Sequence, residues 1–245
     1  VLGLILSEDD KKKYEKLESE IDALLKSGEY DSKIEKIFGK EMSPDAYDIK
    51  RKIGVVFQEI AVFSELTVYE NIDYFCSLYI TDKNKRKEYV NDAIKLVGLE
   101  NYKKFYPKQL SGGLLRRLNI ACGISHKPEL IFLDEPTVAV DPQSRNNILE
   151  GIKKLRDDGA SIVYTTHYME EVVDADYVYV MDKGHVVMQG TPREIFSQVG
   201  TLKEHRLDVP QITLLADLLR QSGLDIPLGV LTREELVDAI MKIAG

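Results

Sequence analysis

The chain has 245 residues, of which 44% are hydrophobic and 30% are charged, a balance typical of a globular protein with a sizeable core. Only 16 residues are glycine, which excludes a collagen-like chain. The 41 acidic residues outnumber the 33 basic ones and leave a net charge of −8. Proteins that bind nucleic acids are usually basic, so we expect no nucleic-acid partner.

Cys76 and Cys122 are the cysteines of the chain. They have no metal-ligand spacing, so we expect two buried thiols in a reducing compartment. The apolar runs are too short and too often broken by charge to span a bilayer, and no signal peptide precedes the apolar run Val1–Ile5. We therefore expect a cytosolic chain whose contact with a membrane runs through a partner.

The first predicted elements are a strand and two helices. Val1–Ile5 is a short apolar run typical of a buried strand. Residues 7–26 begin with a serine cap and three acidic residues, carry apolar residues at helical spacing, and are followed by Gly28 as a stop. They predict an amphipathic helix with a charged outer face. The Ser-Pro pair at residues 43–44 predicts the start of a short helix.

Strands and helices alternate along the rest of the chain. Strands are predicted at residues 53–57, 130–133, 160–165, 177–181 and 185–189, and helices at residues 67–79, 84–97, 111–124, 142–157, 211–222 and from 232 onward. This alternation predicts an α/β domain with a largely parallel sheet.

Polar side chains follow three of the predicted strands. Gln58 follows the first, Asp134 and Glu135 the second, and His167 the third. Ligands of parallel sheets bind at the carboxyl ends of the strands. The order of elements therefore predicts a functional site at this edge of the sheet.

Residues 130–137 read Leu-Ile-Phe-Leu-Asp-Glu-Pro-Thr, an apolar strand that ends in two acids. This is the Walker B pattern. Asp134 is suited to holding Mg²⁺ against nucleotide phosphates, and Glu135 to polarising an attacking water. The alternative is a turn with two solvated acids.

Residues 109–113 read Gln-Leu-Ser-Gly-Gly and open a predicted helix. A serine hydroxyl, two glycines and a helix N-terminus together make a corner suited to binding an anion. The alternative is an ordinary serine-capped helix after a glycine-rich loop.

The order of these motifs resembles that of the nucleotide-binding domain of ATP-binding-cassette (ABC) proteins. Gln58 corresponds to the Q-loop, residues 110–113 to the signature motif, residues 130–135 to Walker B, residues 138–141 to the D-loop, and His167 to the switch histidine. The resemblance covers roughly residues 50–190. It implies a P-loop-NTPase-like fold: a mostly parallel sheet flanked by helices, with a helical signature subdomain at about residues 66–125.

The resemblance also implies a site for ATP and Mg²⁺. In the family, two domains pair head to tail, and ATP lies between the P-loop of one and the signature motif of the other. The residues implied are Glu135 and His167 for catalysis, Ser111, Gly112, Gly113, Gln58 and Asp141 for ATP, and Asp134 and Gln58 for Mg²⁺.

The expected P-loop is missing from the sequence. The pattern G-x-x-x-x-G-K-[ST] should follow the strand at Val1–Ile5, but residues 6–13 read Leu-Ser-Glu-Asp-Asp-Lys-Lys-Lys. Without glycines the backbone cannot wrap a phosphate, and the three acids there would repel ATP. The family strands that precede the P-loop are absent too, so we expect an N-terminally truncated domain. A further departure is Leu114, where the family usually has glutamine.

The residues after about 200 resemble a different part of the family. Leu-Asp-Val-Pro-Gln at 207–211 and Leu-Thr-Arg-Glu-Glu-Leu at 231–236 are similar to the C-terminal extension of ATPases from energy-coupling-factor importers. The middle of the chain is more similar to ABC subunits of multidrug-type exporters. We therefore expect an ABC-type domain at residues 1–200 and a small C-terminal extension at 201–245.

The resemblance implies an ATP-binding subunit of an ABC transporter that couples ATP binding and hydrolysis to transport. Its implied partners are transmembrane subunits and a second ABC ATPase subunit, and its implied location is cytoplasmic, on the inner face of the cell membrane. Without a P-loop, we do not expect the chain to hydrolyse ATP alone. Two alternatives follow: a catalytically silent subunit that lends its signature motif to an intact partner, or an ABC-derived, even engineered, α/β scaffold that does not bind ATP by itself.

Overall fold

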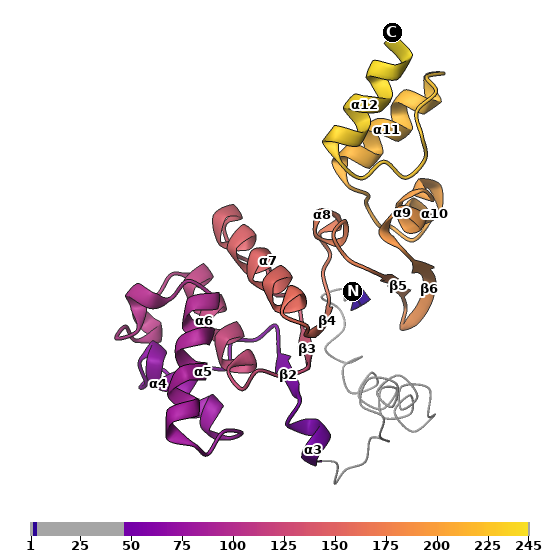
Figure 1. The fold of residues 1–245 in the computed structure, drawn as a ribbon. Helices are drawn as coiled ribbons and strands as arrows, with labels where there is room; N and C mark the ends of the chain where they lie inside the picture. Colours follow the sequence, from indigo (N-terminus) through magenta and orange to yellow (C-terminus); the bar gives the residue numbers. More distant parts are fainter. Residues whose placement is uncertain (1, 4–46, 245) are drawn as a thin grey trace. The chain divides into compact units, whose positions relative to one another are not determined.

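The computed structural model describes residues 2–3 and 47–244. The chain divides into two compact units, one formed by residues 6–163 and the other by Val1–Ile5 with Tyr164–Gly245. We call them the N-terminal unit and the C-terminal unit. The described strands form two three-stranded sheets, with orders β2-β3-β4 and β1-β5-β6. The expected α/β class is confirmed, and Figure 1 shows the elements with their labels.

In the N-terminal unit, β2 (Ile53–Val56) and β3 (Leu130–Leu133) run parallel. Their register pairs Val56 with Leu133, so the two strands end side by side. The residues of β3 are buried or half-buried, as expected for an apolar run in a parallel sheet. Across the third strand, β4 (Ser161–Tyr164), the chain passes into the C-terminal unit.

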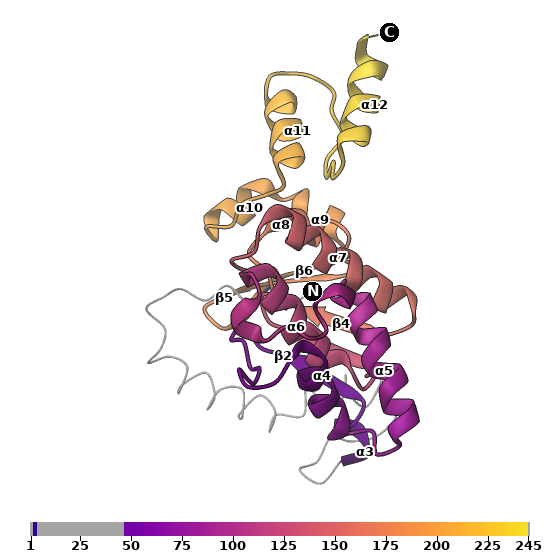
Figure 2. The ribbon, with the colours of Figure 1, turned by 90° about the vertical axis from the view of Figure 1, so that its left-hand side faces the viewer.

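Helices α4 (Val68–Ser77), α5 (Lys83–Leu96) and α6 (Gly112–Ile124) pack against one another (Figure 2). Each starts where a side chain caps it: Thr67 for α4, Asp82 for α5 and Ser111 for α6. The cap of α4 is a full capping box, because Glu70 also accepts a hydrogen bond from the Thr67 amide. These starts lie within two residues of the predicted ones.

Two further α-helices belong to the described N-terminal unit, which also contains the 3-10 helices η2 (Glu100–Tyr102) and η3 (Pro107–Gln109). The short helix α3 (Tyr47–Lys50) precedes β2, and the Ser-Pro pair at residues 43–44, where a short helix is predicted to start, lies outside the described residues. The long helix α7 (Pro142–Asp157) follows β3, has the predicted bounds, and buries Ile148 and Ile152. The predicted helix at residues 7–26 and the sequence where a P-loop is expected lie outside the described residues.

In the C-terminal unit, β1 (Leu2–Gly3) runs parallel to β5 (Val178–Asp182), and β5 pairs antiparallel with β6 (His185–Gly190). Lys183 and Gly184 join the antiparallel strands, and both have positive φ angles of 51° and 80°. Two consecutive residues with positive φ form a turn whose twist matches that of the two flanking strands of a β-hairpin.

Three short helices of this unit were not predicted: α8 (Met169–Val172), α9 (Pro192–Phe196) and α10 (Val199–Glu204). Their apolar side chains join one buried cluster with β5, which includes Val172, Val180, Phe196 and Leu202. Helices this short are marginal in isolation, so tertiary packing stabilises them. Helix α9 also has a capping box, in which Thr191 and Glu194 bond to each other's backbone amides.

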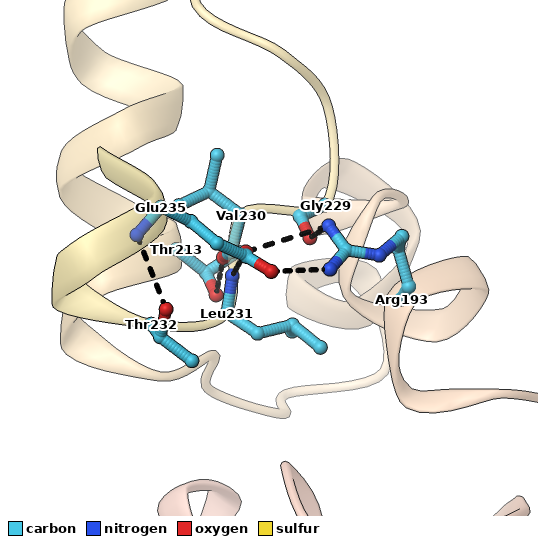
Figure 3. A network of polar contacts seen from close by, with 7 residues as sticks. All are labelled: Arg193, Thr213, Gly229, Val230, Leu231, Thr232 and Glu235. Carbon is cyan, nitrogen blue, oxygen red and sulfur yellow. Dashed lines mark hydrogen bonds and ion pairs between the residues drawn. The ribbon is translucent and has the colours of Figure 1, made fainter. Parts of the chain in front are cut away.

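Helices α11 (Gln211–Gln221) and α12 (Arg233–Ala244) end the chain and share a small core of their own. Figure 3 shows how α12 is tied to α9. The Arg193 guanidinium donates to the Glu235 carboxylate at 2.5 Å and to the Gly229 carbonyl at 2.8 Å. Glu235 also accepts from the Leu231 amide, and its own amide donates to Thr232, the predicted cap of α12.

Candidate functional site

Two of the predicted site residues meet at the ends of neighbouring parallel strands. The Gln58 side chain, two residues after β2, donates a hydrogen bond from Nε2 to Glu135 Oε2 at 3.1 Å. The strand register carries on past β3, because the Asp134 amide donates to the Val56 carbonyl at 2.8 Å. The expectation that strand ends bring polar side chains together is therefore confirmed for Gln58 and Glu135.

The backbone at Glu135 has an unusual conformation. Its φ angle is +42°, in the left-handed region that few residues other than glycine adopt. Such a conformation persists only where the surrounding structure holds it. Glu135 and Asp134 are both half-buried, while Gln58 is exposed.

The surrounding structure includes Arg116, a site residue that the sequence analysis missed. This arginine of α6 is 2% exposed and donates to the carbonyls of Asp134 at 2.6 Å and Glu135 at 2.7 Å. Burial lowers the pKa of Arg116, and the Asp134 and Glu135 carboxylates oppose that shift. Its sequence signal was a charged residue in the largely apolar helix after the signature motif.

Helix α6 also holds the residues after Gln58. Asn119 is 6% exposed; its Oδ1 accepts from the Ala61 amide at 3.1 Å, and its Nδ2 donates to the Phe57 carbonyl at 3.3 Å. The helix that carries the signature residues at its start therefore also anchors the segment around Gln58.

The signature residues lie at the N-terminus of α6. Ser111 caps the helix by accepting a hydrogen bond from the Leu114 amide at 3.3 Å. The structure therefore contains the serine-capped helix that is the alternative to an anion site. Ser111 and Gly112 are exposed, whereas Gly113 is buried. An exposed serine and glycine at a helix N-terminus leave amide groups free to face an anion.

Gly113 brings the signature residues next to the D-loop. A Cβ on Gly113 would lie 2.3 Å from Ser144 Oγ and 3.1 Å from Asp141 Oδ2. Asp141 is exposed and caps α7 by accepting from the Ser144 amide at 2.9 Å. Hydrogen bonds from the Ser144 side chain and amide lower the pKa of Asp141. Gly113 and Asp141 therefore lie close together, as a second set of predicted site residues besides Gln58 and Glu135.

His167 belongs to the C-terminal unit, in the segment between β4 and α8. Its side chain is exposed, and its ring lies beside that of Tyr168, with centroids 4.2 Å apart. The catalytic role that the resemblance implies for His167 stays a prediction.

The chemistry of the donors suits Mg²⁺ bound together with phosphate. Within residues 2–3 and 47–244, no group of three or more His, Cys, Asp or Glu side chains could hold a metal. Mg²⁺ held through nucleotide phosphates needs only one or two carboxylates and keeps several waters. The oxygens of Asp134 and Gln58 fit that smaller requirement.

The described part of the chain contains no helix both long and apolar enough to cross a bilayer.

Comparison with known protein families and sequences finds similar proteins over much of the chain. Residues 21–138 match the family model described as ABC transporter. The energy-coupling factor transporter ATP-binding protein EcfA1 of Caldanaerobacter subterraneus is 45% identical over 205 residues, which cover 80% of this chain and 72% of that protein.

Two solved structures are similar in fold. The structure of cbiO1 from Clostridium perfringens, part of the ABC transporter complex cbiONQ, has a TM-score of 0.60 at 27% identity over 73% of each chain. A dimeric ATP-binding cassette in a post-hydrolysis state, bound to ADP and Pi, has a TM-score of 0.55 at 27% identity and covers 61% of this chain and 68% of its own. With the motifs and their geometry, these likenesses show that the chain belongs to the ATP-binding proteins of the ABC transporter family.

Proposed function

We propose that the chain is the ATP-binding subunit of an ABC transporter and that ATP binding and hydrolysis at its site are coupled to transport across a membrane. The hydrogen bond between Gln58 and Glu135 carries this proposal, because it joins the Q-loop and Walker B residues at one place. The names of the relatives support it: EcfA1 is an ATP-binding protein of an energy-coupling factor transporter, and cbiO1 is part of a transporter complex.

The residues take the roles that the family implies. Glu135 polarises the attacking water, and His167 contacts the γ-phosphate. Asp134 and Gln58 would hold Mg²⁺, which when bound neutralises phosphate charge. Ser111, Gly112 and Gly113 contact ATP across a dimer interface, beside Asp141 of the D-loop.

The partners proposed are transmembrane transporter subunits and a second ABC ATPase subunit, either a copy of this chain or a homologue. The dimeric cassette with ADP and Pi supports a paired arrangement. The chain would then work at the inner face of the cell membrane, held there by its partners. We also propose the division at about residue 200, with a helical signature subdomain at about 66–125. The separate core of α11 and α12, whose buried residues lie between Ala216 and Ala239, supports an extension within residues 201–245.

A second candidate is a silent subunit that lends its signature motif to an intact partner. The sequence at residues 6–13 favours it, because three acids and no glycine stand where the P-loop is expected. In that case the chain has no turnover alone and contributes Ser111, Gly112 and Gly113 to the partner's ATP.

Nucleotide binding and turnover distinguish these functions. Mg-ATP is titrated into the chain alone and into a mixture with EcfA1 of Caldanaerobacter subterraneus, and ATPase rates are measured for both. If the chain's own site works, Glu135→Gln lowers its rate about 100-fold through loss of the general base. If the chain is silent, only Ser111→Arg lowers the rate of the mixture.

Ser64→Arg is the matched control, because Ser64 is also exposed but lies outside the predicted site. Absence of ATP binding, together with a mixture whose rate Ser111→Arg leaves unchanged, would contradict both functions. It would favour the scaffold that does not bind ATP.

A further inference from the structure

The buried guanidinium of Arg116 joins three parts of the N-terminal unit. It lies three residues after Gly113 of the signature motif, on α6. Its Nη1 donates to the carbonyls of Phe57 and Gln58, both at 2.8 Å. Its Nη2 donates to those of Asp134 and Glu135, and its Nε to that of Pro136 at 3.1 Å.

These five bonds use every N–H group that an arginine side chain has. The acceptors are all backbone carbonyls, so the guanidinium bonds to the main chain of two segments rather than to their side chains. A planar, rigid fork is required for this, and lysine has the charge without the fork. The contact is therefore specific to arginine in its geometry as well as its charge.

The two gripped segments contain Gln58 and Glu135, whose side chains bond to each other at 3.1 Å. The φ angle of +42° at Glu135 needs support from its surroundings, and the bond from Arg116 to the Glu135 carbonyl at 2.7 Å gives that support. The backbone conformation at a residue sets the direction of its side chain. Arg116 thus holds the two stretches of backbone from which the Gln58 amide and the Glu135 carboxylate project.

We propose that Arg116 is a positioning residue for hydrolysis. It holds the backbones at residues 57–58 and 134–136 in the one arrangement that aims Gln58 and Glu135 together, and it links that arrangement to the helix of the signature motif. The effect of Arg116 on hydrolysis rests on the proposed function, because Arg116 acts through Glu135. The effect of Arg116 on the two backbone segments does not depend on that function.

The test compares Arg116→Gln and Arg116→Lys with Arg117→Gln. Arg117 is the next residue of the same helix, and its Nη1 donates to the Val97 carbonyl at 3.2 Å, away from both loops. Amide hydrogen exchange is measured by mass spectrometry without nucleotide. Both Arg116 variants are expected to speed exchange about tenfold at residues 57–61 and 134–138, as loss of loop hydrogen bonds predicts. Exchange in α5 stays unchanged, and lysine does not rescue the loops.

Turnover is measured in whichever preparation hydrolyses ATP, the chain alone or the mixture. Where turnover depends on Glu135, the Arg116 variants are expected to lower kcat about 100-fold through misplacement, with KM for ATP unchanged within about twofold. A merely structural role would raise exchange throughout the unit and change both constants together. That result would overturn the proposal, as would loops that exchange at the wild-type rate, or faster loops with an unchanged kcat.

Absence of any Glu135-dependent turnover would refute hydrolysis at this chain's own site, and the exchange experiment alone would then decide the role of Arg116. If neither Arg116 variant folds, guanidinium NMR of the wild-type chain decides it. Slow rotation and slow exchange of the Arg116 Nη protons support the grip, and fast averaging overturns it.

Discussion

Among single residues, the two glycines of the signature motif have opposite surroundings. Nothing lies within 4 Å of a Cβ built on Gly112. A Cβ on Gly113 would lie 2.8 Å from Ser144 Cβ, closer than two such atoms can pack. Gly112 is thus the glycine open to a ligand, and Gly113 is the one that lets α6 lie against the start of α7.

Gly113→Ala is therefore expected to destabilise the unit by about 1–3 kcal/mol, the usual cost of overpacking. Gly112→Ala is the matched control: it is expected to lie between no change and a gain of about 1 kcal/mol, because alanine favours helix. Urea unfolding followed by circular dichroism measures both, since the chain has no tryptophan. Equal stabilities of the two variants would contradict this packing.

Among the elements, α12 is joined to α9 by a partly exposed ion pair between Arg193 and Glu235. Arg193 and Glu235 keep 54% and 36% of their side-chain surface exposed, so solvent weakens the pair. Gly229 makes the close approach possible, because its φ is +66° and a Cβ there would lie 2.8 Å from the Arg193 carbonyl oxygen. The Arg193 hydrogen bond, followed by that of the Leu231 amide, lowers the pKa of Glu235.

A lowered carboxylate pKa gives stability that is present above the ordinary glutamate pKa and lost as the pH falls through the folded-state value. Glu235→Gln is therefore expected to cost up to about 1 kcal/mol at pH 7, and the difference from wild type should vanish in acid. Urea unfolding from pH 7 downward measures it, with the exposed neighbour Glu234→Gln as the control. A difference that stays constant with pH would rule out this ion pair as its source.

In the molecule as a whole, each compact unit has its own buried residues, and the N-terminal unit contains both thiols. Cys76 is 0% exposed and Cys122 is 4% exposed, and neither forms a disulfide, as the sequence analysis expected. Burial is the main cause that raises the pKa of each thiol. The thiolate is the reactive form, so both groups should be inert while the unit stays folded.

Iodoacetamide at pH 8 is expected to leave both cysteines unlabelled in the native chain and to label both in urea, as intact mass will show. Ser64→Cys serves as the positive control, because Ser64 is exposed and a thiol there should react at once. Labelling of Cys76 or Cys122 at the rate of this control would show that the unit opens readily.

Local patterns predicted most of the regular structure. Thr67, Ser111 and Thr232 cap helices where the sequence predicts them, because a capping side chain and an apolar repeat are read from a few neighbouring residues. The short helices α8 and α10 were missed, since each draws its stability from the shared cluster around Phe196 and Leu202. Helix α9 was missed although Thr191 and Glu194 form a capping box that local sequence could have shown.

The sequence by itself determined the order of the motifs, the α/β class and the position of polar site residues directly after predicted strands. These features follow from spacing along the chain. Tertiary structure alone decided that Gln58 bonds to Glu135 and that Arg116 grips both of their backbones. Arg116 lies 58 residues from Gln58 and 19 from Glu135, and its acceptors are main-chain carbonyls that every residue has. A charged residue in a largely apolar helix marks Arg116 itself, but no residue pattern marks its acceptors, so only the packing of α6 against the two strand ends shows the contact.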